Sequence, residues 1–251
     1  RQYRIADSPA DSLGLARTFV VGKVANSRTV LQRALRDHEC PDGRGDMEAV
    51  VLRLGHLIRE LEQVRSVDEL RGKEGEAANR YFCVFDHLIA AQKEAFHFEA
   101  RSRRPPMDNM NALLSYIYTL LTHDANAALE AVGLDPQVGY LHAERPGRPS
   151  LALDLIEEFR AFIGDRLALS LVNLKQVQAT DFKTTESGAV SMSDGARKTL
   201  LAAYQKRKQE EIVHPFLGEK VQVGLLPHLQ ALLLARHIRG DLDGYPPFIW
   251  K

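Results

Sequence analysis

Apolar residues recur at helical spacing along most of this chain of 251 residues. Between Leu13 and Leu35, for example, apolar positions return every three or four residues, which is the repeat of one buried helix face. A chain with this pattern is expected to fold as a set of packed helices. The pattern predicts helices with the approximate ranges 11–36, 46–64, 72–88, 90–100, 109–132, 150–163, 194–213 and 225–239, and a further apolar segment at 167–177.

Local signals set several of these boundaries. Ser66 and Glu69 have the spacing of a capping box, which predicts a short turn at that point. Asp108 and Gly133 are of the residue types that begin and end a helix, and they flank the predicted helix 109–132. Ser150 is expected to cap the helix that carries the candidate carboxylates described below.

One stretch favours β structure. Residues 180–192 are rich in Thr, Ser and Gly, and Phe182 and Val190 flank a short predicted hairpin. No internal repeat or low-complexity tract interrupts the helical pattern. The predicted fold class is therefore mainly α, a multi-helix domain over residues 1–251 with at most a short β-hairpin near 180–192 and a proline-rich tail at 244–251.

Composition and charge exclude several classes of protein. The chain has 33 Lys and Arg residues against 33 Asp and Glu residues, so a nucleic-acid site must come from local clusters of charge. The longest apolar run, 225–235, is interrupted by Pro227 and is too short to span a bilayer, so no membrane attachment is expected. Cys40 and Cys83 lack zinc-site spacing and are expected to be reduced core thiols of a cytoplasmic protein.

Residues 139–160 hold the densest group of candidate functional side chains. His142 is followed by Arg145 and Arg148 in a turn-rich loop, and then by Asp154 and Glu157 on a predicted helix. The two carboxylates are three residues apart and share a helix face. Imidazole and carboxylate groups are ligands for divalent cations, and guanidinium groups bind phosphate oxygens in bidentate fashion. This stretch therefore predicts a metal site that accepts a phosphate-bearing ligand.

Other carboxylates leave the choice of ligands open. Asp154 could ligate the ion or support another ligand by hydrogen bonding, and Glu158 could compete with them or be a solvated charge. Glu74 falls on a buried helical stripe, whereas Glu76 is expected to pair with Arg80 on the solvent side. Because a buried carboxylate needs a cation or hydrogen-bond donors, Glu74 is expected to be either a structural ion pair or a metal ligand.

The central stretch resembles the CRISPR spacer-acquisition integrases. The family pattern runs from Leu-His through an arginine-rich loop to Leu-Ala-Leu-Asp-Leu and Glu-Phe-Arg, as residues 141–160 do here. The resemblance covers essentially the whole chain. Further matching motifs are Arg-Pro-Pro at 104–106, Asn-Ala-Leu-Leu-Ser at 111–115, Ala-Val-Gly-Leu-Asp-Pro at 131–136 and Tyr-Pro-Pro-Phe-Ile-Trp at 245–250.

This resemblance implies a metal-dependent DNA endonuclease and integrase. Such an enzyme inserts short foreign DNA fragments, called spacers, into the CRISPR repeat array by transesterification, as part of antiviral defence. The family's metal ligands match Glu74, in a Glu-Gly motif, together with His142 and Glu157, and Asp154 takes a supporting place. The implied cofactor is Mg²⁺ or Mn²⁺.

The resemblance also implies partners. They are double-stranded DNA, a second copy of the chain in a homodimer, the small second Cas protein that bridges two dimers, and the fourth Cas nuclease as a fusion or a separate chain. Family members carry a small β-rich domain before the helices. We expect that domain to lie outside this chain, with residues 1–10 at the interdomain connection.

Basic side chains gather at three places along the sequence. Each cluster is either a solvated face or a set of contacts to DNA phosphates, and joint phosphate binding requires them to surround the metal. The clusters are Arg101, Arg103 and Arg104; Arg145 and Arg148; and Lys206, Arg207 and Lys208.

Two alternatives of other classes remain at this point. Glu94 with His97, and Glu211 with His214, form two Glu-x-x-His motifs of the kind found in helical di-iron proteins. The other alternative is a helical interaction module without a metal. Iron absorbance would favour the first alternative, and a lack of divalent-metal binding would favour the second.

Overall fold

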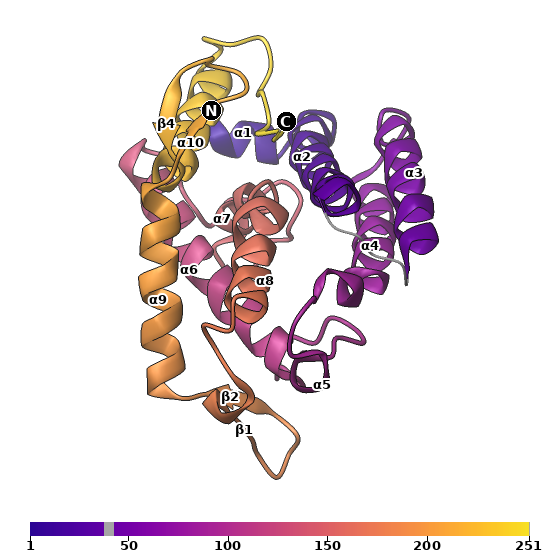
Figure 1. Ribbon diagram of the computed structural model, residues 1–251. Helices are drawn as coiled ribbons and strands as arrows, with labels where there is room; N and C mark the ends of the chain where they lie inside the picture. Colours follow the sequence, from indigo (N-terminus) through magenta and orange to yellow (C-terminus); the bar gives the residue numbers. More distant parts are fainter. Residues whose placement is uncertain (38–42, 251) are drawn as a thin grey trace.

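The computed structural model describes residues 1–37 and 43–250, and these residues are mainly helical (Figure 1). The predicted loop at 40–45 therefore lies largely outside the described residues. The helices are α1 (Gln2–Ala6), α2 (Pro9–Asp37), α3 (Arg44–Leu61), α4 (Val67–Cys83), α5 (Lys93–Phe96), α6 (Asn109–Ala131), α7 (Ser150–Ile156), α8 (Arg166–Asn173), α9 (Asp194–Gln209) and α10 (Leu226–Arg239). Short 3₁₀ turns lie at Phe85–Leu88, Ala179–Asp181 and Val223–Leu225, and a π-helical segment lies at Arg160–Asp165.

The long helix α2 is the element against which the others are arranged. It packs against α3 and α4 on one side and against the π-helical segment on the other, and α6 packs against α7 and α10. The two termini lie on the same side of the molecule, while the first hairpin lies at the opposite end beside the start of α9 (Figure 1). Helix α2 thereby joins the N-terminal helices to the rest of the fold.

Helix α4 begins earlier than the sequence predicts. The side chain of Ser66 accepts a hydrogen bond from the backbone N–H of Glu69, so the capping residue is confirmed, but it opens a helix of 17 residues instead of a short turn. Gly72 and Gly75 consequently lie inside α4. The low helix propensity of glycine is overridden here because Leu70 and Ala77, with others, are buried in the core.

The predicted helix 150–163 is divided into two parts. Ser150 is its first residue and not its cap, and its hydroxyl donates to the carbonyl of Ala143. Helix α7 ends at Ile156, and the chain continues as the π-helical segment before α8. Gly164 permits this because a Cβ there would lie 2.8 Å from the Tyr118 ring, so α6 approaches closely. Wide π turns of this kind are frequent at functional sites.

Two hairpins are present where the sequence predicts at most one. The predicted hairpin is confirmed as β1 (Phe182–Thr184) and β2 (Val190–Met192). The predicted helix 194–213 instead ends at Gln209, and β3 (Glu211–Val213) pairs antiparallel with β4 (Lys220–Gln222). The apolar side chains of Ile212 and Val221, which are paired in register, pack on the core and favour the strand. The predicted helix 90–100 is reduced to α5.

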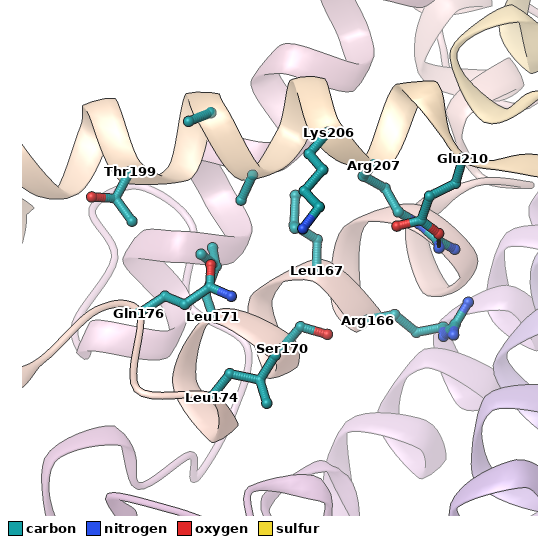
Figure 2. Close-up of a pocket in the computed structure, with 12 residues that line it drawn as sticks. Arg166, Leu167, Ser170, Leu171, Leu174, Gln176, Thr199, Lys206, Arg207 and Glu210 are labelled. Atoms are coloured by element: carbon teal, nitrogen blue, oxygen red, sulfur yellow. Dashed lines mark hydrogen bonds and ion pairs between the residues drawn. The ribbon is translucent and has the colours of Figure 1, made fainter.

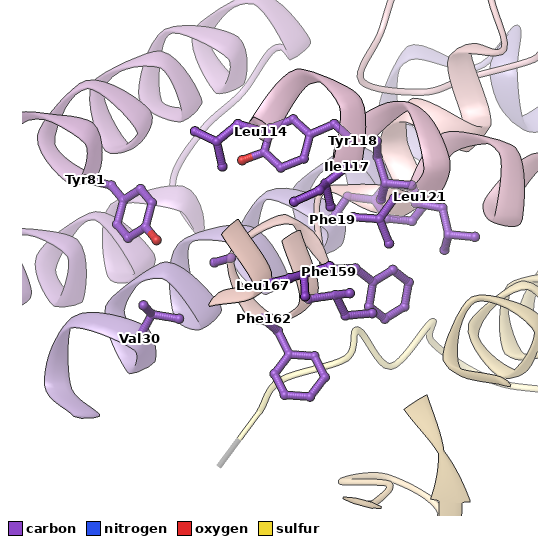
Figure 3. Packing of buried hydrophobic residues seen from close by; sticks show 14 of the residues in the cluster. Phe19, Val30, Tyr81, Leu114, Ile117, Tyr118, Leu121, Phe159, Phe162 and Leu167 are labelled. Atoms are coloured by element: carbon purple, nitrogen blue, oxygen red, sulfur yellow. The ribbon is translucent and has the colours of Figure 1, made fainter. Parts of the chain in front are cut away.

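One continuous apolar core joins the helices. Phe19 of α2, Ile117 of α6 and Phe159 lie among the side chains that fill the space between these elements (Figure 3). At Gly22 the backbone of α2 comes so near α7 that a Cβ would lie 3.0 Å from Cγ of Glu158. This close approach brings the middle of α2 next to the end of α7, where the candidate carboxylates lie.

The C-terminal tail is built into this core. Asn26 of α2 is fully buried; its amide donates to the carbonyl of Glu158 at 2.7 Å and to that of Phe248 at 2.8 Å, and it accepts from the N–H of Trp250. The Glu158 carboxylate in turn accepts from the N–H of Phe248, the hydroxyl of Tyr245 and an amide. Glu158 is therefore not the solvated charge or metal ligand that its sequence position allowed.

Two smaller expectations have different outcomes. Within the described part of the chain, no helix has the combined length and apolar character needed to span a membrane. Cys83 is a free thiol but is exposed, so its predicted core position is wrong; Cys40 lies outside the described residues.

We predict that Asn26→Ala lowers the free energy of unfolding by about 3 kcal/mol, because it leaves two buried carbonyls and one buried N–H without partners. Denaturation by urea, monitored by circular dichroism, measures this loss. Asn126→Ala is the control, since Asn126 makes only a solvent-exposed hydrogen bond to Glu130. Equal stability of the two variants would contradict the role given to the buried amide.

We also predict a pH dependence from Glu158. Burial raises the pKa of this carboxyl from 4.5 to about 8, although three donors oppose that rise. The stability it contributes is therefore complete below pH 4.5 and is lost as the pH rises through about 8.

The Glu158→Gln variant cannot ionise at this position. The difference between its unfolding free energy and that of the parent protein should therefore rise in favour of the variant by about 4 kcal/mol between about pH 5 and about pH 9. Glu130→Gln, at an exposed position of α6, should show a constant difference. A constant difference for Glu158→Gln as well would show that this carboxyl ionises normally in the folded protein.

Candidate metal centre

The candidate site is assembled from four separate elements. Helix α2 supplies Lys23, α4 supplies Glu74, the loop after α6 supplies His142, and the end of α7 supplies Glu157. The side chain of Glu157 is 4% exposed, whereas those of Glu74 and His142 are 23% and 21% exposed. The group thus lies at the boundary between core and solvent, which a ligand from outside can reach.

Asp154 holds the loop that carries His142. Its carboxylate is fully buried and accepts backbone N–H groups from Tyr140, Leu141 and His142, at 2.6, 3.0 and 2.9 Å. It also lies 2.6 Å from Nδ1 of the His142 ring. These contacts occupy both oxygens of Asp154, so its geometry suits the supporting place and not that of a direct ligand. A proton on Nδ1 would leave Nε2 free to ligate.

Glu157 is the most highly connected carboxylate of the group. Its Oε1 accepts from Nε of Arg160 at 2.9 Å and lies 3.9 Å from Nε2 of His142, while its Oε2 lies 2.6 Å from Nζ of Lys23. Burial alone raises the pKa of Glu157, but Arg160 and Lys23 outweigh it and hold this pKa well below its ordinary value. Glu157 is therefore ionised, as a ligand must be.

Lys23 joins Glu157 to Glu74. Its ammonium donates to Oε1 of Glu74 as well as contacting Glu157, and its side chain is 10% exposed. Burial alone lowers the pKa of Lys23, but the two carboxylates raise it above its ordinary value, so the side chain is charged. Glu76, two residues after Glu74 on α4, pairs with Arg53 of α3. The sequence predicts a pair with Arg80 instead.

A divalent cation at this place would take its ligands from these side chains. Among the described residues, no three His, Cys, Asp or Glu side chains lie in an arrangement that could hold a metal ion as they stand. However, Oε2 of Glu157 is buried and makes no hydrogen bond of good geometry, and a positive charge already lies between it and Glu74. Two carboxylates around one cation position, with a nearby imidazole, are chemically suited to Mg²⁺ or Mn²⁺. The residues therefore fit the ion.

His142 lines a cleft with a volume of about 850 Å³. The cleft lies between the α1–α2 junction, the start of α4 and the loop at 139–144. Arg71 of α4 lines it, donates to the carbonyl of Leu141 and pairs with Asp68. A ligand in this cleft would meet the imidazole from the solvent side.

Arginines predicted to contact DNA gather near this loop. The charge of Arg148 interacts with those of Arg145, Asp154, Arg104 and Arg71, and burial together with the other arginines lowers the pKa of Arg148. Arg104 of the linker is therefore close enough to Arg148 for their charges to interact. Basic groups close to a candidate metal ligand are suited to contacts with a phosphate backbone.

Arg101 has a structural role instead. It donates to Asn111 at 2.5 Å and to Ser115 at 3.2 Å, and it lies over the ring of Tyr118. Tyr118 donates to the buried carboxylate of Asp165, whose pKa is raised to about 6 by burial. Arg103, two residues after Arg101, is exposed on the linker, and the structure records no such contact for it. The cluster at 101–104 is thus divided between core and surface.

Lys206 and Arg207 lie on a different face. They line a groove between α8 and α9 with a volume of about 540 Å³, whose lining residues differ from those of the His142 cleft (Figure 2). Arg207 pairs with Glu210 there, and Arg166 lies at the same end of the groove. Of the predicted basic side chains, Arg104 is thus within electrostatic range of the loop at 144–149, whereas Lys206 and Arg207 line a separate groove.

The di-iron alternative is contradicted by the fold. Glu94 and His97 lie on and just after α5, which has four residues, while Glu211 lies in the strand β3. His214 is fully buried and bonds Gln230 at 3.2 Å. These motifs do not face a common space between long helices.

Two charged groups of the site were missed by sequence reasoning. Lys23 lies three residues after Val20 and four residues after Phe19, on the apolar stripe of α2. A lysine at such a position indicates that a buried partner of opposite charge lies nearby. Arg160 follows Glu157 by three residues, the spacing of a helical ion pair. Both signals were present in the sequence.

Comparisons with known proteins place this chain in a family. The family model described as CRISPR associated protein Cas1 matches residues 1–206. A CRISPR-associated endonuclease Cas1 of Chlorobaculum tepidum is 59% identical over 251 residues, covering 100% of this chain and 73% of the relative. A CRISPR-associated exonuclease Cas4/endonuclease Cas1 fusion of Geobacter sulfurreducens is 37% identical over 257 residues, covering 100% of this chain and 45% of the fusion.

A solved structure extends the likeness to the fold. A casposase bound to integration product matches with a TM-score of 0.85 and 25% identity, covering 100% of this chain and 67% of that chain. The family match spans most of the sequence, and the identity to the first relative is far above the level that chance produces. The chain belongs to the Cas1 family of CRISPR-associated proteins.

Proposed function

We propose that this chain is a divalent-metal-dependent DNA endonuclease and integrase that inserts spacers into a CRISPR array. The observation that supports the proposal is that Glu74 and Glu157 share the ammonium of Lys23, while Nε2 of His142 lies 3.9 Å from the other oxygen of Glu157. Family membership supports the same conclusion, since the relatives are named as endonucleases and the matched casposase was solved with an integration product.

The side chains have distinct tasks in this proposal. Glu74, His142 and Glu157 hold the ion, and Asp154 keeps the imidazole of His142 oriented through Nδ1. Arg160 keeps Glu157 ionised and fixes one of its oxygens. A bound Mg²⁺ or Mn²⁺ would polarise the scissile phosphate and stabilise the charge that develops on it. The attacking group is a DNA 3′-hydroxyl in integration and a water in cleavage.

The metal preference follows from the ligand types. Two carboxylates are hard oxygen ligands that suit both Mg²⁺ and Mn²⁺, and the imidazole shifts affinity toward Mn²⁺. The proposed set contains no thiolate, which disfavours iron–sulfur chemistry and structural zinc. Three protein ligands leave positions for phosphate oxygens.

The DNA path in this proposal crosses the loop at 144–149. Arg145, Arg148 and Arg104, with Arg103 beside them, would bind backbone phosphates next to the cleft, and such contacts carry no base specificity. Lys206 and Arg207 would touch DNA only on the separate α8–α9 face.

The proposed assembly is that of the family. It consists of a homodimer on double-stranded DNA, joined to the small second Cas protein as a bridge, in the prokaryotic cytoplasm. The fourth Cas nuclease is a further proposed partner, supported by the Cas4–Cas1 fusion among the relatives.

We predict that Glu74→Gln, His142→Ala and Glu157→Gln each lower the strand-transfer rate by at least about a hundredfold, because each removes one of three ligands of one ion. Strand transfer is measured with labelled spacer and repeat DNA in Mg²⁺ or Mn²⁺, and the parent protein should be inactive in excess EDTA. Glu76→Gln, which touches Arg53 and not the site, is the control. Full activity in Glu157→Gln would reject it as a ligand.

We predict that the double variant Arg145→Ala, Arg148→Ala weakens binding to all DNA sequences and reduces the slope of log affinity against log salt by about 2, since each phosphate contact releases counterions. Fluorescence anisotropy between about 50 and about 200 mM salt measures this. The control is the double variant Arg197→Ala, Lys198→Ala, which removes two positive charges from exposed positions of α9 and not from the loop at 144–149. An identical slope in both double variants would place the two loop arginines off the DNA.

A further inference from the structure

The cation position in the candidate site is filled by a side chain of the protein itself. Lys23 lies in the middle of α2, and its ammonium contacts Glu74 of α4 and, at 2.6 Å, Oε2 of Glu157. The two carboxylates come from parts of the chain 83 residues apart (157 minus 74), and they would repel each other in the absence of a positive charge. The ammonium of Lys23 thus allows the carboxylates of Glu74 and Glu157 to lie close together.

The same oxygens are those that a metal would need. Oε1 of Glu157 is held by Arg160, and Oε2 is the atom beside the ammonium that also contacts Glu74. Divalent cations bind carboxylate oxygens directly, at about 2.0–2.2 Å for Mg²⁺. An ammonium and a divalent cation cannot both occupy the space between the same two oxygens, because their charges repel strongly at such a distance.

We propose that Lys23 and the divalent cation compete for the position between Glu74 and Glu157. This inference rests on the proposed function, since it takes these two carboxylates to be metal ligands. Without metal, Lys23 holds the carboxylates together and keeps the empty site assembled. When metal enters, the ammonium withdraws, so metal binding is weaker than the same ligands would give without the lysine.

The surroundings of Lys23 are suited to this exchange. The ammonium is carried on a flexible four-carbon stem, so it can leave without moving the backbone of α2. Arg160 is less able to withdraw, because its guanidinium also packs over the ring of Tyr118 at 4.5 Å. The two cations beside Glu157 therefore differ: one is anchored and one can leave.

The test measures metal binding and not activity. Mn²⁺ is titrated at one fixed pH into the parent protein, Lys23→Met and Lys23→Gln, by calorimetry, with free Mn²⁺ followed by electron paramagnetic resonance. We expect both variants to bind Mn²⁺ at least about tenfold more tightly than the parent protein. In EDTA both should melt at a lower temperature than the parent protein, because the carboxylates have lost their cation. Lys23→Gln keeps a hydrogen-bonding amide, and it decides the question if Lys23→Met does not fold.

Lys73→Met is the matched control. Lys73 is the sequence neighbour of Glu74, but it pairs with Glu60 on the other side of α4. Its loss should leave Mn²⁺ affinity unchanged. Unchanged or weaker Mn²⁺ binding in the folded Lys23 variants would overturn the competition, while leaving the proposed metal site intact. Absence of Mn²⁺ binding in the parent protein and in every variant would instead contradict the metal site of the proposed function, and the inference with it.

Discussion

A lysine between two carboxylates is the interaction on which the candidate site depends. Ionised groups are costly to bury, and they remain buried only when each has a partner of opposite charge or several hydrogen bonds. Glu157 meets this condition through Lys23 and Arg160, which come from opposite sides of it. Arg160 continues the chain of contacts to Tyr118 of α6, which bonds the buried Asp165. One polar network thus connects α2, α4, α6 and α7 at the place where chemistry is proposed.

Two adjacent glutamates divide the work of stability and function. Glu157 faces the cation position, while Glu158 faces the core and binds the C-terminal tail through Phe248 and Tyr245. Asn26 adds contacts from α2 to the same tail and to the backbone of Glu158. Because Asn26 follows Lys23 by three residues on α2, the tail helps to set the distance between the two helices that carry Lys23 and Glu157. The last residues of the chain therefore support the site without lining it.

Charge is balanced over the chain but not over its surface. The equal numbers of acidic and basic residues gave no sign of a partner, yet Arg145 and Arg148 lie in one loop after His142, and folding brings Arg104 within electrostatic range of Arg148. Arg166 and Arg207 instead form a separate group on the α8–α9 groove. A nucleic acid senses such local clusters through its phosphates, so the net charge of a chain is a poor guide to this kind of partner.

Helical periodicity by itself determined that this chain is mainly α, where most helices lie, and which stretch carries a histidine, two arginines and the carboxylates, because these depend on residues a few positions apart. Several features depend on contacts between distant residues, and only the tertiary structure decided them. They include the π-helical segment beside Gly164, the second hairpin after Gln209 and the burial of Glu158 under the tail. The pairing of Lys23 with Glu74 and Glu157 is of the same kind. Lys23 was missed by sequence reasoning, although it is a charge on an apolar stripe. Its partners come from the helix α4 and the end of α7, and only packing brings them to it.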